Sequence, residues 1–159
     1  MNEKLIVGIA DMKLAQNEGE IITYALGSCI GICLYDPLLK LASLVHIMLP
    51  SNMEGGRANI YKYADSGILE ALNQMALRGG SRFRIVAKIA GGAKMFELSG
   101  GALGSIGQRN FESVRTVLRR ENIRLLAEDV GGTIARTMSC DPATGQVFIR
   151  SYGQPEKIL

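Results

Sequence analysis

The sequence contains no tryptophan, a single histidine and only three cysteines among its 159 residues. The cysteines, Cys29, Cys33 and Cys140, are odd in number and show no CxxC spacing, and His46 has no second histidine beside it. A disulfide framework needs paired cysteines, and a zinc site needs several Cys or His ligands at short spacings. The composition therefore predicts reduced thiols and no bound metal.

Long apolar runs are also missing, and aromatic residues make up only 6% of the chain. Residues 1–4 lead directly into a short strand-like run without the apolar stretch of a secretory signal, and no run is long enough for a membrane span. We therefore expect a cytoplasmic protein without membrane insertion. The net charge of +3 comes from scattered basic residues, with the densest group at Arg115, Arg119, Arg120 and Arg124. We interpret this group as a solvated helix face and expect no nucleic-acid partner, because aromatic residues are sparse.

The remaining composition, 47% apolar and 21% charged, is typical of a folded globular protein and predicts one domain over residues 1–159. Short apolar patterns predict strands at residues 5–10, 20–26, 30–35, 41–49, 83–90, 123–130, 133–140 and 146–152. Turn residues separate several of these segments.

Two longer segments carry helical spacing of apolar residues. The first, residues 59–78, has Asn59 as a candidate N-cap and ends before Gly79, and the second has Asn110 as a candidate N-cap and ends near Asn122. Many strands with two long helices predict an α+β fold, in which the helices pack on a mixed β-sheet.

The stretch around which the functional interpretation is built is Thr23-Tyr24-Ala25-Leu26-Gly27-Ser28-Cys29. Gly27 and Ser28 favour a tight bend, which places Cys29 beside backbone N–H groups. Asp36-Pro37 starts a turn between the strand-like segments on either side, and this hairpin brings Cys29 and His46 together near its open end.

A cysteine attacks acyl groups as a thiolate, and histidine is the side chain whose ordinary pKa suits proton exchange with it near neutral pH. We interpret Cys29 as a candidate nucleophile and His46 as its candidate base. The two are expected to titrate as a coupled pair in which each stabilises the charged form of the other. The alternative is that both are core residues, because free cysteine and a lone histidine in an apolar strand are commonly buried.

Gly91 and Gly92, followed by Ala93, come after a strand-like segment, where backbone can approach a ligand closely. A phosphate cradle is excluded, because the spacing matches neither the Walker pattern nor GxGxxG. A backbone wall beside the active site and a tight turn with close packing both remain open. The polar loop at residues 51–57 follows His46 and is a candidate rim or lid.

Five short segments stand in a fixed order along the chain: Gly27-Ser28-Cys29, Leu44-Val45-His46-Ile47-Met48-Leu49-Pro50, Lys88-Ile89-Ala90-Gly91-Gly92-Ala93-Lys94-Met95-Phe96, Gly104-Ser105-Ile106-Gly107-Gln108-Arg109-Asn110 and Leu126-Ala127-Glu128-Asp129-Val130-Gly131-Gly132. Together, from about residue 8 to residue 150, they make the chain resemble the chemoreceptor glutamine deamidase family, CheD. The resemblance implies a layered α/β sandwich similar to the catalytic domain of the cytotoxic necrotizing factor toxins.

The resemblance also implies an activity and the residues that carry it. The substrate is a glutamine on the cytoplasmic domain of a methyl-accepting chemotaxis receptor, which becomes glutamate with release of ammonia through a thioester. By resemblance Cys29 is the nucleophile, His46 the base and acid, and Thr23 the residue that orients the histidine. No metal or organic cofactor is required, and the chemotaxis phosphatase CheC is implied as a second partner.

Backbone groups complete this expected site. Gly27 and Ser28 are expected to hold the oxyanion through the N–H groups of the bend, and Gly91 and Gly92 to contact the oxyanion or the substrate. Two other classes of function remain open: a catalytically quiet adaptor that binds receptor or CheC, and a related acyl-transfer activity such as a transglutaminase or methylesterase.

Overall fold

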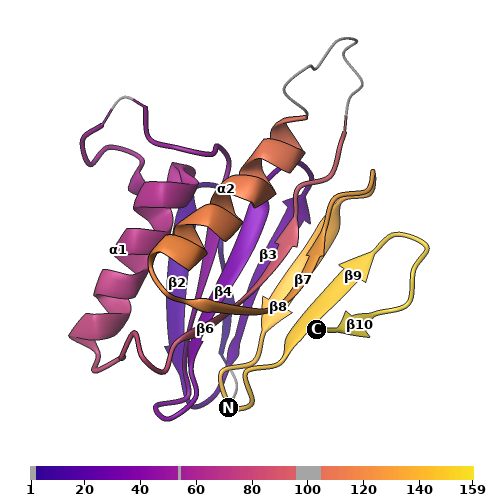
Figure 1. The fold of residues 1–159 in the computed structure, drawn as a ribbon. Helices are drawn as coiled ribbons and strands as arrows, with labels where there is room; N and C mark the ends of the chain where they lie inside the picture. Colours follow the sequence, from indigo (N-terminus) through magenta and orange to yellow (C-terminus); the bar gives the residue numbers. More distant parts are fainter. Residues whose placement is uncertain (1–2, 54, 96–104) are drawn as a thin grey trace.

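The computed structural model describes residues 3–53, 55–95 and 105–159. Within these ranges the chain forms two α-helices, a short 3₁₀-helix and ten strands, which confirms the predicted α+β class (Figure 1). The strands are β1 (Lys4–Ile6), β2 (Asp11–Gln16), β3 (Glu20–Leu26), β4 (Ile30–Asp36), β5 (Leu41–Ile47), β6 (Val86–Gly91), β7 (Arg124–Val130), β8 (Arg136–Cys140), β9 (Val147–Ser151) and β10 (Lys157–Ile158). The helices are η1 (Ile60–Lys62), α1 (Ala64–Leu77) and α2 (Ile106–Arg120).

The strands form two sheets, whereas the sequence predicted a mixed sheet without indicating that the strands divide between two. The central sheet has the order β2-β5-β4-β6-β7, and the outer sheet has the order β1-β3-β8-β9-β10. Each sheet is mixed, because β6 is parallel to β7 and β1 is parallel to β3 while the other pairs are antiparallel. Apolar patterns locate strands along the chain, but they do not say which strands become partners.

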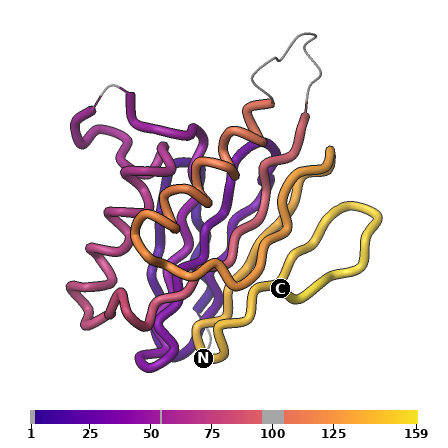
Figure 2. The backbone as a smooth tube through the Cα atoms, in the orientation of Figure 1, coloured from indigo at the N-terminus to yellow at the C-terminus, as the bar shows by residue number. Residues whose placement is uncertain are grey.

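Two apolar cores separate three layers. The first core lies between the helices and the central sheet and includes Ile32, Ile68 and Val114. The second lies between the two sheets and includes Cys33 and Met138. Both helices cover one face of the central sheet and contact each other (Figures 1 and 2). The layers agree with the expected sandwich, and the likeness to the cytotoxic necrotizing factor domain stays a prediction.

Strands β4 and β5 are buried along their whole length, because the central sheet is covered on both faces. Successive side chains of a strand point to opposite faces, so neighbouring residues of β4 enter different cores. Ile30 packs toward the helices, whereas Cys29 and Cys33 pack against the core between the sheets. This alternation decides which side of the sheet the candidate nucleophile faces.

Both predicted N-caps are wrong. Asn59 precedes only η1, with a left-handed backbone and no side-chain capping bond, and α1 begins later, at Ala64. Helix α2 begins at Ile106, where the Ser105 side chain accepts a hydrogen bond from the Gln108 N–H at 3.2 Å. Asn110 therefore lies inside α2, and it is fully buried.

The predicted first strand, residues 5–10, is also wrong in extent. The chain leaves the outer sheet after β1, turns at Ala10 with φ of 60°, and enters the central sheet as β2. The strand predicted from Phe83 begins at Val86 instead, because residues 82–84 form a turn in which the Arg84 N–H donates to the Ser81 carbonyl at 2.9 Å. The hairpins around Asp36-Pro37 and residues 141–145 are confirmed by the antiparallel pairs β4–β5 and β8–β9.

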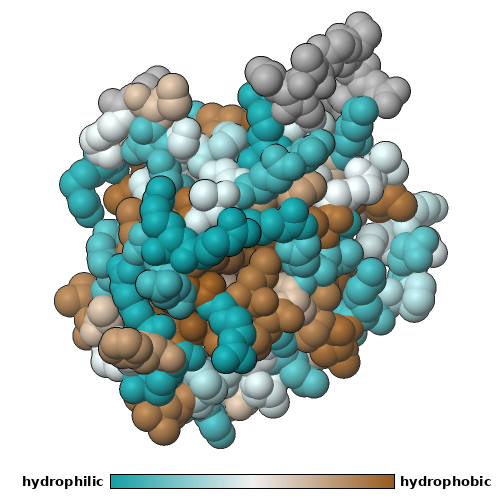
Figure 3. Space-filling view, viewed as in Figure 1, coloured by the Kyte–Doolittle hydropathy of each residue, from teal (hydrophilic) through white to brown (hydrophobic). Residues whose placement is uncertain are grey.

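Hydrophilic side chains cover the outer face of α2 (Figure 3). Arg119 and Arg120 are exposed there, as expected from the sequence, but the predicted solvated face is wrong for the other two arginines, because Arg124 lies in β7 and Arg115 pairs with Glu128 of β7. None of the helices in the described ranges is long and apolar enough to cross a membrane.

Candidate active site

The pairing of β4 with β5 sets the positions of Cys29 and His46. Gly31 lies opposite His46, and Ile30 lies opposite Ile47 at the end of the ladder. Cys29 precedes β4 and faces the same side as Gly31, so it is the diagonal neighbour of His46 across the two strands. The hairpin thus brings both residues to its open end, on the face that meets the outer sheet.

Side chains of the outer sheet pack directly against this position. A Cβ added to Gly31 would lie 2.7 Å from Met138 Sδ and 3.1 Å from Leu26 Cδ1. Any larger residue at Gly31 would therefore have to displace the side chains of Met138 and Leu26. The close approach lets Thr23 of β3 reach across to His46 of β5.

Thr23 and His46 form a fully buried hydrogen-bonded pair. Thr23 Oγ1 lies 2.7 Å from His46 Nδ1 and donates its proton to the Val7 carbonyl at 2.8 Å. A hydroxyl has one proton to donate, so Thr23 Oγ1 accepts the second bond, and the proton of that bond comes from His46 Nδ1. In the neutral imidazole this assigns the free lone pair to Nε2.

Burial controls the charge state of His46. The side chain is 1% exposed, and burial lowers its pKa from 6.5 to about 4. Asp11 pairs with His46 in the strand register, but its carboxylate binds the Lys13 ammonium and the Met12 N–H. His46 is therefore neutral at physiological pH, and Nε2 has no hydrogen-bond partner within the described ranges.

Cys29 differs from the other two cysteines in its exposure. It is half-buried, whereas Cys33 and Cys140 are buried, so its thiol alone among the three is within reach of a substrate. Burial raises the pKa of the Cys29 thiol. The structure thus favours a neutral thiol beside a neutral imidazole, in place of the mutually stabilised ions expected from the sequence. No hydrogen bond joins Cys29 Sγ to His46 in the part of the chain that is described.

The bend before Cys29 is held by backbone contacts. The Ala93 N–H donates to the Gly27 carbonyl at 2.8 Å, and the Gly92 N–H donates to the Cys29 carbonyl at 2.9 Å. A Cβ on Gly91, where φ is 117°, would lie 2.1 Å from the Cys29 carbonyl oxygen. The segment after β6 can therefore lie against the bend only because residue 91 is glycine.

Gly91 and Gly92 are themselves buried. A Cβ on Gly92 would meet the Phe111 ring at 2.7 Å and the Gly107 carbonyl at 2.9 Å, so Gly92 packs under α2. This arrangement supports the close-packing interpretation and a role in holding the Cys29 backbone. Direct contact of either glycine with the substrate or oxyanion stays a prediction.

The backbone N–H groups of the bend are not equivalent. The Gly27 N–H donates to the Ala25 carbonyl at 3.0 Å, which leaves it occupied. The N–H groups of Ser28 and Cys29 have no acceptor among the described residues. Ser28 and Cys29 are therefore the candidate oxyanion donors, and the Gly27 N–H is not available in this conformation.

Asn110 is a component of the site that the sequence interpretation missed. Its Nδ2 donates to the Ser28 carbonyl and to the Met48 carbonyl, each at 2.9 Å. Placing the start of α2 at residue 106 would have put Asn110 on the buried stripe with Val114 and Val117, and a polar residue on such a stripe is a detectable signal.

An exposed apolar side chain lies beside the bend. Met95 lies over Gly27, since a Cβ on that glycine would be 3.1 Å from Met95 Cγ, and Met95 is 44% exposed. Tyr24 is also exposed, but it points to the opposite face of β3 from Thr23, where Lys4 Nζ lies 5.9 Å from the centroid of its ring. In the loop at residues 51–57, of which residue 54 lies outside the described ranges, the Asn52 N–H donates to Asp65 Oδ1 of α1 at 2.9 Å. Its expected role as a lid stays a prediction.

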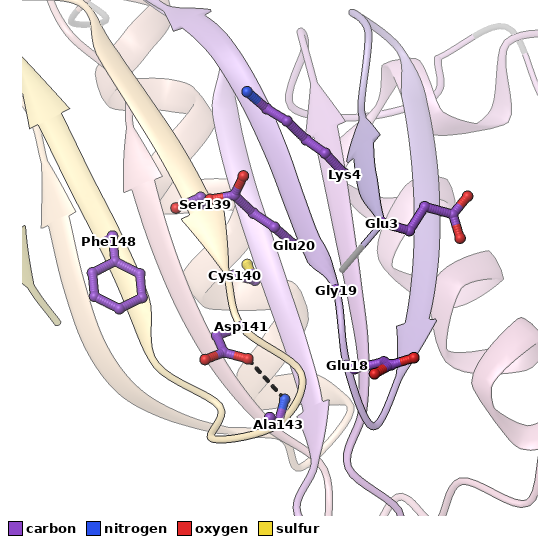
Figure 4. A pocket seen from close by; sticks show the side chains of 10 residues that line it. All are labelled: Glu3, Lys4, Glu18, Gly19, Glu20, Ser139, Cys140, Asp141, Ala143 and Phe148. Carbon is purple, nitrogen blue, oxygen red and sulfur yellow. Dashed lines mark hydrogen bonds between the residues drawn. The ribbon is translucent and has the colours of Figure 1, made fainter. Parts of the chain in front are cut away.

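A separate hollow of about 420 Å³ lies at the other end of β3, between the N-terminal strand and the β8–β9 turn (Figure 4). The carboxylates of Glu3, Glu18 and Glu20 on its walls point in different directions. No cluster of three or more potential metal ligands occurs in residues 3–53, 55–95 and 105–159. We therefore assign no ligand to this hollow, which contains none of the three candidate catalytic residues.

Comparison with known proteins agrees with the resemblance. The family described as CheD chemotactic sensory transduction matches residues 48–151. A protein of Syntrophomonas wolfei, named probable chemoreceptor glutamine deamidase CheD, is 45% identical over 161 residues and 100% of both chains. Proteins of the same name from Desulforamulus reducens and Moorella thermoacetica are each 44% identical over 160 residues, covering 99% of this chain and 96% of their own. The family match begins after His46, whereas the Syntrophomonas alignment also covers Thr23, Cys29 and His46.

Proposed function

The chain belongs to the CheD family, and from that premise we propose that it deamidates glutamine side chains of chemotaxis receptors by a Cys29–His46–Thr23 thioester mechanism. The names of the relatives support the reaction and the class of substrate. The observation that carries the mechanism is the Thr23–His46 hydrogen bond, which leaves the Nε2 lone pair of a neutral imidazole on the face shared with Cys29.

The first half of the reaction forms a thioester. As the thiol of Cys29 attacks the amide carbon of the glutamine, His46 Nε2 takes the thiol proton, so no stable thiolate is needed beforehand. The carbonyl oxygen becomes an oxyanion, which the N–H groups of Ser28 and Cys29 stabilise. His46 then gives its proton to the leaving nitrogen, and ammonia departs.

The second half restores the enzyme. His46, neutral again, takes a proton from water as the water oxygen attacks the thioester carbon. The carbon–sulfur bond breaks, the Cys29 sulfur recovers the proton from His46, and the glutamine has become glutamate. Thr23 keeps Nδ1 protonated throughout and holds Nε2 in the role of acceptor.

The surroundings of Cys29 fit a macromolecular substrate. The thiol is half-buried rather than enclosed, and the exposed Met95 beside the bend offers apolar contact area. A glutamine side chain can enter beside it while the receptor remains outside. The receptor cytoplasmic domain is the proposed partner in the cytoplasm, and CheC is a proposed second partner.

The proposal is tested with the purified chain and a purified receptor cytoplasmic domain. We expect ammonia release and a matching change of amide to acid in the receptor mass, both abolished by Cys29→Ala and retained by Cys140→Ala. A quiet adaptor would bind receptor without releasing ammonia, and a methylesterase would release methanol. A transglutaminase would release ammonia but join an added amine to the glutamine. Ammonia release that survives Cys29→Ala would overturn the mechanism.

A further inference from the structure

Two buried side-chain polar atoms lack a hydrogen-bond partner in the described part of the chain, and both belong to the candidate active site. One is His46 Nε2, whose lone pair the proposed mechanism uses. The other is Asn110 Oδ1, on a fully buried residue of α2. Buried polar atoms without partners destabilise a fold, so each needs a reason to be there.

The orientation of the Asn110 amide follows from its partners. Both neighbours of Nδ2 are backbone carbonyls, which only accept, so the NH₂ group must face Ser28 and Met48. This orientation leaves Oδ1 without a donor. The side chain therefore makes two donated hydrogen bonds through Nδ2, while its acceptor atom Oδ1 makes none within the described residues.

The two carbonyls lie just beyond the end of the β4–β5 ladder. The last residue pair is Ile30 with Ile47, after which the Met48 N–H turns away to the Lys62 carbonyl at 2.8 Å. No ladder bond joins the two strands past this point among the described residues. Asn110 bridges the gap, with one bond to each strand end.

Each bridged carbonyl is close in sequence to a reacting group. Ser28 directly precedes Cys29, and Met48 follows His46 by two residues. We propose that Asn110 is a positioning residue that sets the distance between the Cys29 thiol and His46 Nε2. The effect of this positioning on catalysis rests on the proposed function, whereas the two hydrogen bonds of Asn110 are observed in the structure. An error of 1 Å in such a distance can cost about 100-fold in rate.

The test is a double-mutant cycle on the reactivity of the Cys29 thiol. Iodoacetamide alkylation of Cys29 is followed by mass spectrometry at pH 8 in wild type, Asn110→Leu, His46→Gln and the double variant. Leucine keeps the branching of the Asn110 side chain, with two methyl groups in place of the planar amide, and removes both donors. We expect Asn110→Leu to slow alkylation about 10-fold when His46 is present, and by less than about 2-fold when His46 is replaced. The reason is that Asn110 acts on the thiol only by setting its distance from His46.

Receptor deamidation supplies the second readout. Asn110→Leu is expected to lower kcat by about 100-fold and to leave KM within about 2-fold. Ser113→Ala is the matched control, because it removes another bond from the same helix, the 2.7 Å contact to the Pro50 carbonyl, without touching Ser28. It should keep kcat within about 2-fold of wild type. If Asn110→Leu does not fold, Asn110→Ser takes its place in both experiments.

Equal slowing of alkylation in both backgrounds, or none in either, would overturn the proposal, because Asn110 would then act on the fold alone or not at all. The same holds if Ser113→Ala lowers kcat as much as Asn110→Leu. The alkylation cycle needs no receptor. A wild-type protein that fails to deamidate receptor therefore contradicts the proposed function, and leaves the positioning role to be decided by the cycle.

Discussion

The two halves of the site are built in different ways. His46 lies inside β5, is almost fully buried, and is oriented by a side-chain bond to Thr23 in the other sheet. Cys29 lies outside any strand, is half-buried, and is held through its backbone by Gly92 and through its neighbour Ser28 by Asn110. The proposed base is thus fixed by the core, and the proposed nucleophile is held by a bend that leaves the thiol half-buried.

This difference assigns separate tasks to the two halves. Burial keeps the imidazole of His46 neutral, so that it can accept a proton, and the Thr23 bond selects the accepting nitrogen. In the proposed mechanism, partial exposure lets Cys29 reach an amide, and its raised pKa keeps the thiol protonated until His46 takes the proton. Changes to the His46 half should therefore affect proton transfer, and changes to the Cys29 half should affect geometry.

The largest expected effect comes from removing the base. His46→Gln should lower receptor deamidation by about 1,000-fold, within the usual range for loss of a general base. Asp11→Asn is the control, because Asp11 pairs with His46 in register but binds Lys13. It should change turnover by less than about 2-fold. A His46→Gln protein with more than a tenth of wild-type turnover would remove His46 from the mechanism.

The next test addresses the backbone half. Gly91→Ala places a Cβ 2.1 Å from the Cys29 carbonyl in a left-handed conformation, so we expect a loss of unfolding free energy of about 3 kcal/mol and a lower kcat. Gly153→Ala shares the positive φ, 75°, but meets nothing within 4 Å, and should cost only about 1 kcal/mol. Denaturant unfolding of both variants separates the two effects. Equal losses of unfolding free energy would mean that Gly91 is needed only for its positive φ, and not for the close contact with the Cys29 carbonyl.

Much of the site was predictable from sequence, because local pattern determines it. The bend at Gly27-Ser28 and the turn at Asp36-Pro37 are local signals, and together they bring Cys29 and His46 to one end of a hairpin. The same reasoning failed where a partner distant in sequence decides the outcome. The two-sheet arrangement was not predictable, because it depends on which strands pair.

Asn110 shows the same limit at the level of one residue. Its sequence context favours a helix cap as much as a helix interior, since asparagine is a good N-cap. Ser105 takes the capping role instead, and this shifts Asn110 into the helix. The bonds to Ser28 and Met48 then join segments 82 and 62 residues away in the chain, which no local pattern can indicate.

The third prediction concerns stability at acid pH and tests the burial of His46. In the unfolded chain His46 takes up a proton near its ordinary pKa of 6.5, whereas in the folded protein it does so only at about 4. Between these values the unfolded state binds more protons, so stability falls as the pH is lowered. We expect a loss of about 3 kcal/mol of unfolding free energy between pH 6.5 and pH 4.

His46→Gln should flatten this part of the stability profile. The lowered pKa values of Asp11 and Asp36 act in a different window, because those carboxylates lose their contribution only as the pH falls to their usual value of 3.8 and below. Urea unfolding at a series of pH values distinguishes the two. A slope between pH 6.5 and pH 4 that persists in His46→Gln would show that another group causes it.

The smallest expected effect comes from the hydroxyl that orients the base. Thr23→Val keeps the shape of the side chain but removes the acceptor of His46 Nδ1–H and the donor to the Val7 carbonyl. We expect a loss of about 2 kcal/mol in stability and about 10-fold in turnover, because the imidazole can then turn or change tautomer. Thr23→Ser keeps the oxygen and should restore turnover to within about 3-fold of wild type, since both hydrogen bonds can re-form. Steady-state deamidation and thermal unfolding of the two variants decide the matter: if valine and serine behave alike, packing by β3 orients His46 and the hydroxyl does not.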